Sequence, residues 1–224
     1  MSLRVVSNQP DDFRARVVIP LPERRFMAAG GGPRPMIDVV VPVQNKETHL
    51  APSIRRLRAC LAEDLPFSSR ITIADAASTD GTFAVAWQLA AEFSEVRVLH
   101  LSEKGRGRAL AAAWLTSDAR VVAEMDVDAS ADLPALLPLL APVIAGHTDI
   151  SIGSRHAAAT HSNLLVRLLL GPGLREVQCG CKAMRADVAR RLVPQVVSRD
   201  WLFDTELLAR AQRAGLRIRE LPAN

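Results

Sequence analysis

The sequence predicts an α/β fold in which helices flank a doubly wound, mostly parallel sheet. Two observations support this prediction. Short β-branched apolar runs alternate with amphipathic helical patterns from residue 37 to about residue 152, and polar residues gather where several of these runs end. Ligands of such sheets bind outside the carboxyl ends of the strands, so the alternation also predicts where a functional site should lie.

The first strand and helix show the pattern most clearly. Residues 37–43 form a β-branched run that is typical of a buried parallel strand. Apolar residues then recur at helical spacing from Leu50 to Leu61, with arginines on the opposite face. Further strands are expected at 71–74, 96–99, 121–125 and 149–152, and further helices at 83–90, 110–114 and 132–144.

The alternation ends at Gly153. In order along the chain, we then expect a helix at 164–170, a compact segment at 177–182, helices at 185–192 and 201–211, and a closing strand at 216–221. Gly215 is expected to cap the last helix.

Residues 1–36 are expected to form an N-terminal extension or linker, and residues 37–224 a single domain. The extension shows no clear periodicity and ends in the glycine- and proline-rich stretch 30–35. Within it, residues 17–19 are a candidate edge strand.

Composition limits the classes of function. The chain has 224 residues, of which 49% are hydrophobic, enough for one α/β domain with a buried core. Its net charge of +4 fits an anionic substrate or a phospholipid surface as well as nucleic acid. Because the chain has no tyrosine and only 4% aromatic residues, it offers little stacking surface, and no nucleic acid partner is expected.

Cysteine usage and hydropathy indicate a cytoplasmic protein. The three cysteines have no framework spacing, which indicates reduced thiols. No run reaches the ~18 apolar residues that a membrane span requires, and the first 16 residues lack the apolar core of a signal peptide. Any contact with a membrane is expected to be peripheral, on its inner face. The sequence leaves the oligomeric state open.

Two carboxylates follow the strand at 121–125. Asp126 and Asp128 are separated by one residue, so their side chains can face the same point. Such a pair is strained unless a cation lies between them, and hard oxygen ligands suit Mg²⁺ or Mn²⁺, usually together with phosphate oxygens. We therefore expect a divalent metal that holds a diphosphate. The alternative is a solvated turn, where aspartate is common.

Polar residues also follow three other expected strands. Asn45, Asp75 and Lys104 each lie at or just after the end of a run. Since the carboxyl ends of parallel strands meet at one edge of a sheet, these residues are expected to converge with Asp126 and Asp128.

Seven short motifs follow one another along the chain. They occupy residues 41–47, 75–82, 105–107, 126–128, 153–155, 178–182 and 203–207. Together they resemble the sequence blocks of the family 2 glycosyltransferases, and within that family those of the polyprenyl- and dolichyl-phosphate mannose or glucose synthases. The resemblance runs from about residue 37 to residue 224. It implies a GT-A fold, which is Rossmann-like, and makes 37–224 the catalytic domain.

The resemblance also implies an activity. The chain would be a metal-dependent inverting glycosyltransferase that moves a hexose from a UDP- or GDP-sugar to an acceptor, with Mg²⁺ or Mn²⁺ as cofactor. Polyprenyl phosphate at a membrane surface is the expected acceptor, and cell wall glycan biosynthesis the expected context.

Two alternatives stay open because the chain departs from the family blocks. Gln44 replaces a tyrosine, Ala76 replaces an acidic residue, and the segment between Arg155 and Asn163 is short. The same donor site could serve a soluble or glycan hydroxyl, or the chain could be a non-catalytic nucleotide-binding homologue.

The resemblance further implies roles for single residues. It implies that the nucleotide contacts Pro42, Val43, Gln44, Lys46, Ile73, Asp75, Lys104 and Arg106. Within this set, Asp75 would accept a hydrogen bond from the base. Asp126 and Asp128 would hold the metal, with Val127 and Ser130 beside it. Further contacts, mainly to phosphate, would come from Arg155, Gln178 and Lys182.

The catalytic group implied by the resemblance comprises Asp126, Asp128, Arg155 and Asp204. A phosphate acceptor is already ionised and needs little help from a base, whereas a hydroxyl acceptor needs one. Asp204 or Glu206 is the candidate base. The simpler role for Asp204 is the N-cap of a helix.

Overall fold

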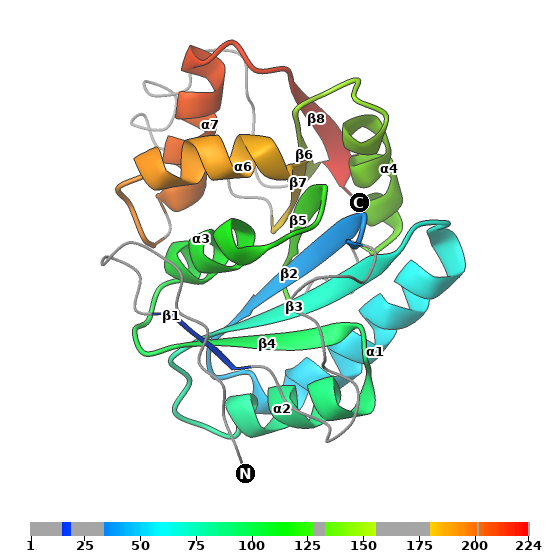
Figure 1. Cartoon of the computed structure of the whole chain (residues 1–224), viewed down its shortest axis with the longest axis vertical. Helices are drawn as coiled ribbons and strands as arrows, with labels where there is room; N and C mark the ends of the chain where they lie inside the picture. Colours follow the sequence, from blue (N-terminus) through cyan, green and yellow to red (C-terminus); the bar gives the residue numbers. More distant parts are fainter. Residues whose placement is uncertain (1–14, 19–33, 128–132, 156–179, 201, 224) are drawn as a thin grey trace.

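An eight-stranded, mostly parallel sheet organises the molecule (Figure 1). The computed structural model describes residues 15–18, 34–127, 133–155, 180–200 and 202–223. In spatial order the strands are β1 (Ala15–Val18), β4 (Val96–Leu101), β3 (Ser69–Ala76), β2 (Ile37–Val43), β5 (Val121–Met125), β7 (Cys181–Arg185), β6 (Ile150–Arg155) and β8 (Ile218–Ala223). Strand β7 is antiparallel to both of its neighbours, and β1 is antiparallel to β4.

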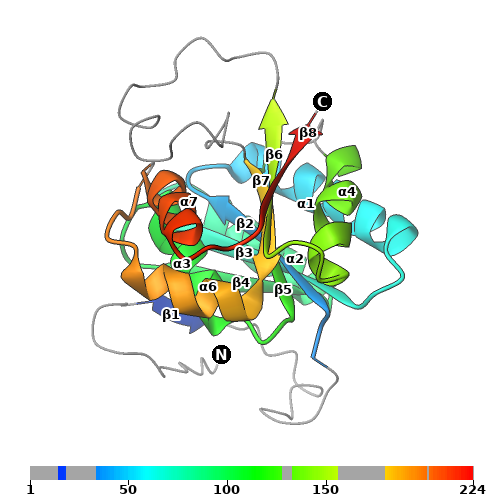
Figure 2. The ribbon, with the colours of Figure 1, turned by 90° about the horizontal axis from the view of Figure 1, so that it is seen from above.

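Helices cover both faces of the sheet (Figure 2). One face carries α1 (Glu47–Asp64), α2 (Thr82–Glu92) and α4 (Leu133–Ile144). The other carries α3 (Arg106–Thr116), α6 (Ala186–Leu192) with the 3-10 turn η2 (Val193–Gln195), and α7 (Phe203–Arg213). No helix in the described part of the chain is long and apolar enough to cross a membrane.

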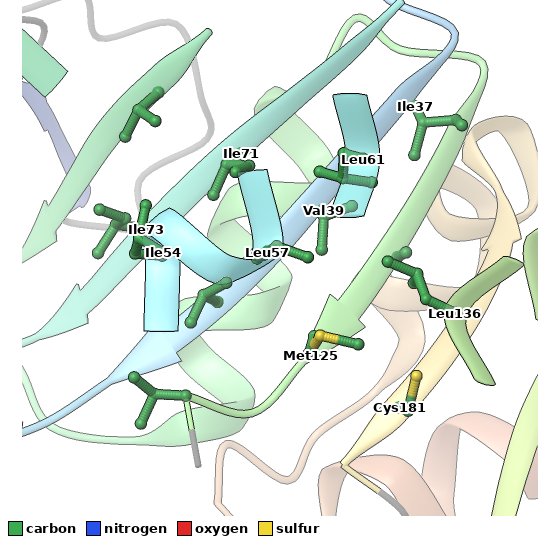
Figure 3. Packing of buried hydrophobic residues seen from close by; sticks show 14 of the residues in the cluster. Ile37, Val39, Ile54, Leu57, Leu61, Ile71, Ile73, Met125, Leu136 and Cys181 are labelled. Atoms are coloured by element: carbon green, nitrogen blue, oxygen red, sulfur yellow. The ribbon is translucent and has the colours of Figure 1, made fainter. Parts of the chain in front are cut away.

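The core under α1 shows how the apolar spacing in the sequence produces this layer. Ile54, Leu57 and Leu61 project from α1 onto the sheet, where Val39 and Ile71 belong to the same buried cluster (Figure 3). Burying an aliphatic side chain of this size contributes roughly 1.5–3 kcal/mol. The helical period and the strand period therefore place their apolar faces against each other.

The structure confirms the predicted α/β alternation, with the ends of most elements shifted by a few residues. Gly215 ends α7 with a left-handed backbone (φ +67°), as predicted. Strand β7 is a correction, because the sequence predicts only a compact segment at 177–182. Lysine is disfavoured in strands, but Lys182 lies directly opposite Glu124 of β5, so cross-strand pairing overrides the local propensity.

Two predictions concern segments that lie wholly or partly outside the described residues. The helix predicted at 164–170 lies outside them. Within the predicted extension at 1–36, residues 15–18 form β1 and so join the edge of the sheet beside β4. The domain boundary at residue 36 stays a prediction.

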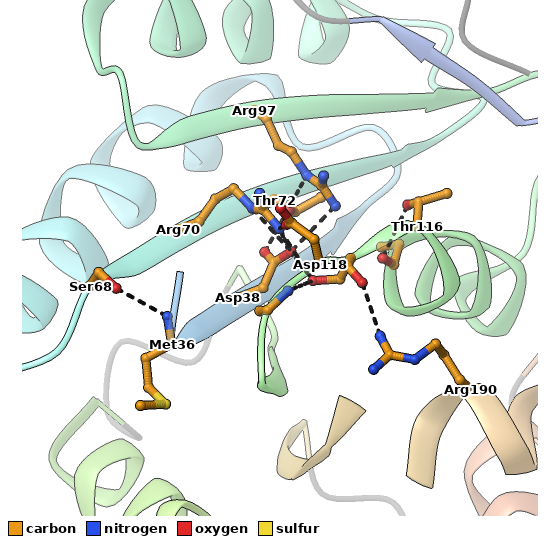
Figure 4. Close-up of polar contacts among 12 residues, drawn as sticks. Met36, Asp38, Ser68, Arg70, Thr72, Arg97, Thr116, Asp118 and Arg190 are labelled. Carbon is orange, nitrogen blue, oxygen red and sulfur yellow. Dashed lines mark hydrogen bonds and ion pairs between the residues drawn. The ribbon is translucent and has the colours of Figure 1, made fainter. Parts of the chain in front are cut away.

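A polar network holds the sheet together near the amino end of β2 (Figure 4). Asp38 is completely buried there and accepts hydrogen bonds from Thr72 Oγ1 (2.6 Å) and Ser117 Oγ (2.7 Å). The guanidinium groups of Arg70 and Arg97 lie 2.9 Å and 3.3 Å from its Oδ2. The network therefore compensates one buried negative charge with two cations from the neighbouring strands β3 and β4.

The substitution Asp38→Asn should lower the free energy of unfolding by about 3 kcal/mol or more, because it leaves two partly buried guanidinium groups without their shared anion. Urea denaturation followed by circular dichroism measures this change. Arg55→Ala breaks an exposed pair with Glu92 and should cost less than about 1 kcal/mol. Equal losses in the two variants would contradict the structural role of Asp38.

Candidate active site

Hydrogen bonds join the loops that follow β2 and β3. The N–H of Asn45 donates to Ser78 Oγ (2.9 Å), and the N–H of Thr79 donates to Asn45 Oδ1 (2.8 Å). Asn45 has a left-handed backbone (φ +52°), which asparagine tolerates better than most residues. Glu47 Oε2 accepts the N–H of Gly81 (3.0 Å), and a Cβ at that glycine would overlap the Glu47 carboxylate. The two loops therefore form one fixed wall at this edge of the sheet.

Asp75, near the carboxyl end of β3, is completely buried. Its Oδ2 lies 2.7 Å from Nδ1 of His100, its neighbour in the register of β4. Because an ionised carboxylate only accepts, Nδ1 of His100 is the donor of this hydrogen bond. The His100 side chain is 32% exposed and packs on the ring of Phe83, with centroids 4.7 Å apart. A ligand at this edge would meet His100, which Asp75 orients.

The sequence prediction includes Asp75 and misses His100. The available signal is the position of His100 in the next strand, since in-register neighbours of a parallel pair lie side by side. The contact of Asp75 with a base stays a prediction.

Asp126 follows β5 and is held against Gly180. Its N–H donates to the carbonyl oxygen of Gly180 (3.0 Å), and a Cβ at Gly180 would overlap the Asp126 carboxylate. The side chain of Asp126 is 41% exposed. A partly exposed carboxylate that the packing of Gly180 holds in place suits a divalent metal.

The predicted metal pair is described only in part. Asp128 lies outside the described residues, and within them no group of three potential ligands is close enough to hold a metal. The donor chemistry of Asp126 fits Mg²⁺ or Mn²⁺, and the role of Asp128 stays a prediction.

Next to Asp126 lies a group of four charges, here called the charged cluster: Arg106 of α3, Glu124 of β5, Lys182 of β7 and Asp204 of α7. Arg106 is half-buried and the other three are buried. Lys182 Nζ lies 2.5 Å from Glu124 Oε2 and 2.8 Å from Asp204 Oδ1. Arg106 Nη1 lies 2.7 Å from Asp204 Oδ2, and its Nη2 pairs with Glu124 Oε1. The same Nη2 is 3.4 Å from Asp126 Oδ1. The cluster thus connects four elements to the predicted metal ligand.

Within the charged cluster, burial and ion pairing shift the pKa values of the charged groups in opposite directions. Burial raises the pKa of Glu124 to about 7, although the charge of Lys182 acts in the other direction. Burial also opposes the charge of Asp204, but Lys182 and Arg106 outweigh it and hold the pKa of Asp204 below its usual value. For Lys182, Asp204 and Glu124 outweigh burial and raise the pKa. Asp204 and Lys182 are therefore an ion pair.

The predicted contact residues divide into buried and accessible sets. The buried side chains are Val43, Ile73, Asp75, Val127 and Lys182. Partly or fully exposed are Pro42, Gln44, Lys46, Lys104, Arg106 and Asp126. Ser130, Gln178 and the side chain of Arg155 lie outside the described residues, so their roles stay predictions.

The proposed N-cap role of Asp204 is wrong. Helix α7 begins at Phe203 with Leu202 as its N-cap, so Asp204 lies inside the first turn and points into the charged cluster. Glu206, the other candidate base, accepts the N–H groups of Val197 and Ser198 and so fixes the loop before α7.

Gly107 explains how α3 and α7 come close enough for this cluster. A Cβ at Gly107 would lie 2.5 Å from Cβ of Phe203, so only glycine permits this approach. Gly107 belongs to the predicted motif at 105–107, and its close packing brings Arg106 within reach of Asp204.

Comparisons with known proteins identify the family and agree with this fold. The model of the family described as "Glycosyl transferase family 2" matches residues 38–192, more than half of the chain. Glycosyltransferase AglD of Haloferax volcanii is 31% identical over 218 residues, which cover 91% of this chain and 35% of that protein. An undecaprenyl-phosphate mannosyltransferase of Micrococcus luteus is 32% identical over 200 residues, which cover 82% of this chain and 80% of that protein.

A solved structure shares the fold. Glucosyl-3-phosphoglycerate synthase from Mycobacterium tuberculosis, in complex with Mn²⁺, uridine diphosphate and phosphoglyceric acid, superposes with a TM-score of 0.64 at 18% identity. The match covers 84% of this chain and 68% of that chain. The predicted GT-A architecture is thereby confirmed.

The substitution Gly180→Ala should displace the Asp126 carboxylate and weaken Mn²⁺-dependent nucleotide binding by about 10–100-fold, the usual cost of disturbing the support of a metal ligand. Titration calorimetry measures the affinity.

The matched control is Gly146→Ala. Gly146 has a left-handed backbone (φ +72°) and open space around it, so the control should cost about 1–2 kcal/mol of stability and leave binding unchanged. Unchanged binding in Gly180→Ala would contradict the packing of Gly180 on Asp126.

Proposed function

The chain belongs to the family 2 glycosyltransferases and is thus an enzyme that moves a hexose from a nucleotide sugar; we propose that its reaction depends on a divalent metal, inverts the anomeric carbon and uses polyprenyl phosphate as the acceptor. The name of the Micrococcus luteus relative supports this acceptor. A lipid acceptor would bring the protein to a membrane surface, so we also propose peripheral contact with the inner face of a membrane.

The donor site of this proposal rests on the convergence of residues at one edge of the sheet. The nucleoside would lie against the wall of the β2 and β3 loops, beside His100 and Gln44. The diphosphate would lie toward Asp126, where Arg106 offers a half-buried guanidinium. Because Glu124 and Asp204 engage its two Nη groups, Arg106 would act on the diphosphate mainly through its positive charge.

Asp126, together with Asp128, would hold the Mg²⁺ or Mn²⁺ ion. When bound, the metal acts as a Lewis acid that offsets the negative charge developing on the departing nucleoside diphosphate. Asp126 keeps its place through its N–H bond to Gly180, and Arg106 adds a second positive charge at the same position.

The choice of a phosphate acceptor rests on one observation, the ion pairing and burial of Asp204. Both of its oxygens face cations, its side chain is 3% exposed, and its pKa is held below the usual value by Lys182 and Arg106 against the effect of burial. A general base works best when its pKa lies near the working pH, so Asp204 is poorly suited to deprotonate a hydroxyl. A phosphate monoester loses its second proton near pH ~6 and attacks without a base. The polyprenyl phosphate acceptor therefore fits better than a hydroxyl.

Titration calorimetry with UDP and with GDP, each with Mn²⁺ and with chelator, tests the donor site. We expect one nucleotide to bind tightly only when Mn²⁺ is present, and Asp126→Asn to weaken that binding by about 10–100-fold. Binding of neither nucleotide would contradict the proposal and favour the non-catalytic alternative.

An acceptor competition tests the second half of the proposal. With the nucleotide sugar that binds, transfer to a short-chain polyprenyl phosphate should exceed transfer to the matching polyprenol, which differs only by the phosphate. Product analysis by mass spectrometry measures both. Transfer to the polyprenol or to a soluble glycan alone would show that the acceptor is a hydroxyl.

A further inference from the structure

Arg106 has three carboxylates within reach, and only one of them is a predicted metal ligand. Its Nη2 pairs with Glu124 and is 3.4 Å from Asp126, while its Nη1 lies 2.7 Å from Asp204. A guanidinium and a divalent metal compete for the same carboxylate oxygens. The place of Arg106 therefore decides how much negative charge Asp126 can offer to a metal.

The charged cluster is balanced without Asp126. It contains two cations, Arg106 and Lys182, and two carboxylates, Glu124 and Asp204. Glu124 is completely buried, and its two oxygens are shared between these cations, Oε2 with Lys182 and Oε1 with Arg106. Since these four charges compensate one another, the cluster does not need the charge of Asp126, and Arg106 makes only a long contact of 3.4 Å with it.

We propose that Glu124 is a positioning residue that keeps Asp126 available to the divalent metal by holding Nη2 of Arg106 away from it. This inference rests on the function proposed above. Glu124 lies outside all seven motifs of the sequence, so only its contacts point to this role.

Neutralising Glu124 would release Arg106 toward Asp126. In Glu124→Gln the cluster would hold two cations and one carboxylate. Nη2 already makes a long contact of 3.4 Å with Asp126 Oδ1, and without Glu124 this contact would shorten toward the usual length of a charged hydrogen bond, about 2.7–2.9 Å. Arg106 would then neutralise the carboxylate that the metal needs.

Lys182→Met changes the balance in the opposite direction. It removes one cation and leaves Arg106 as the one cation of the cluster facing Glu124 and Asp204, so at a pH where Glu124 is ionised Arg106 would be held more firmly by these two carboxylates. The metal site would keep its charge. The double variant, Glu124→Gln with Lys182→Met, restores one cation to one carboxylate. Asp204 Oδ1, freed from Lys182, should then accept Nη2 of Arg106, while Nη1 keeps its contact with Oδ2.

The experiment uses whichever of UDP and GDP the wild type binds. Calorimetry above neutral pH measures the Mn²⁺ concentration at which binding of this nucleotide is half-maximal. In Glu124→Gln this concentration should rise by about 10–100-fold, as for the loss of other groups that support a metal ligand. In Lys182→Met it should stay the same or fall, and in the double variant it should return to within about threefold of wild type.

A merely structural role for Glu124 gives a different pattern. Both single variants break the same pair between Glu124 and Lys182, so a packing defect would weaken metal-dependent binding in both and would add in the double variant. Asp38→Asn is the matched control, because it removes another buried charge from the same face of the sheet near the amino end of β2. It should lose stability and keep the Mn²⁺ dependence of wild type.

Several results would overturn the inference. They are an unchanged Mn²⁺ dependence in Glu124→Gln, an equal loss in Lys182→Met, and no recovery in the double variant. If Glu124→Gln does not fold, Lys182→Met and the double variant still decide, because weakened Mn²⁺ dependence in either one contradicts the proposed charge balance. Failure of wild type to bind either nucleotide with Mn²⁺ would instead overturn the proposed function, so the two failures are distinguishable.

Discussion

The buried ion pair between Glu124 and Lys182 is the interaction on which the site depends. The two residues face each other across the antiparallel pair of β5 and β7, where water does not reach them. Buried charges are costly unless each is paired, so Arg106 of α3 also pairs with Glu124, and Asp204 of α7 also pairs with Lys182. This requirement brings together a strand pair and two helices that are distant in sequence. It also fixes the guanidinium beside the predicted metal ligand.

The two ends of the strands hold different kinds of polar residues: buried ones at the amino end of β2 and partly exposed ones at the carboxyl ends. Near the amino end of β2, Asp38 is completely buried and both of its carboxylate oxygens are engaged by neighbouring side chains. At the carboxyl ends, Asp126 and His100 keep part of their side chains accessible. The same residue types thus serve two purposes, and exposure to solvent distinguishes them. A closed network holds strands together, whereas a partly open one can exchange its partners for a ligand.

Much of the fold and part of the site could be predicted from local patterns. Apolar periods placed the strands and helices, and the end of each strand indicated Asp75 and Asp126. Strand β7 was missed because its lysine is favourable only opposite Glu124. His100 and Glu124 were missed because neither lies in a motif, and each gains its role from a neighbour in another strand. Register between strands is not encoded in a local pattern.

The sequence by itself determined the architecture and the edge of the sheet at which the predicted site residues lie, because hydrophobic period and strand ends are local properties of the chain. The family also followed from motifs readable in order, and the comparisons confirm it. Only the tertiary structure decided which charges compensate one another. It assigned Asp204 to Lys182 and Arg106 instead of the N-cap, and it made Glu124 the partner of both cations. Ion pairing depends on distance and burial in space, and those quantities exist only after the chain has folded.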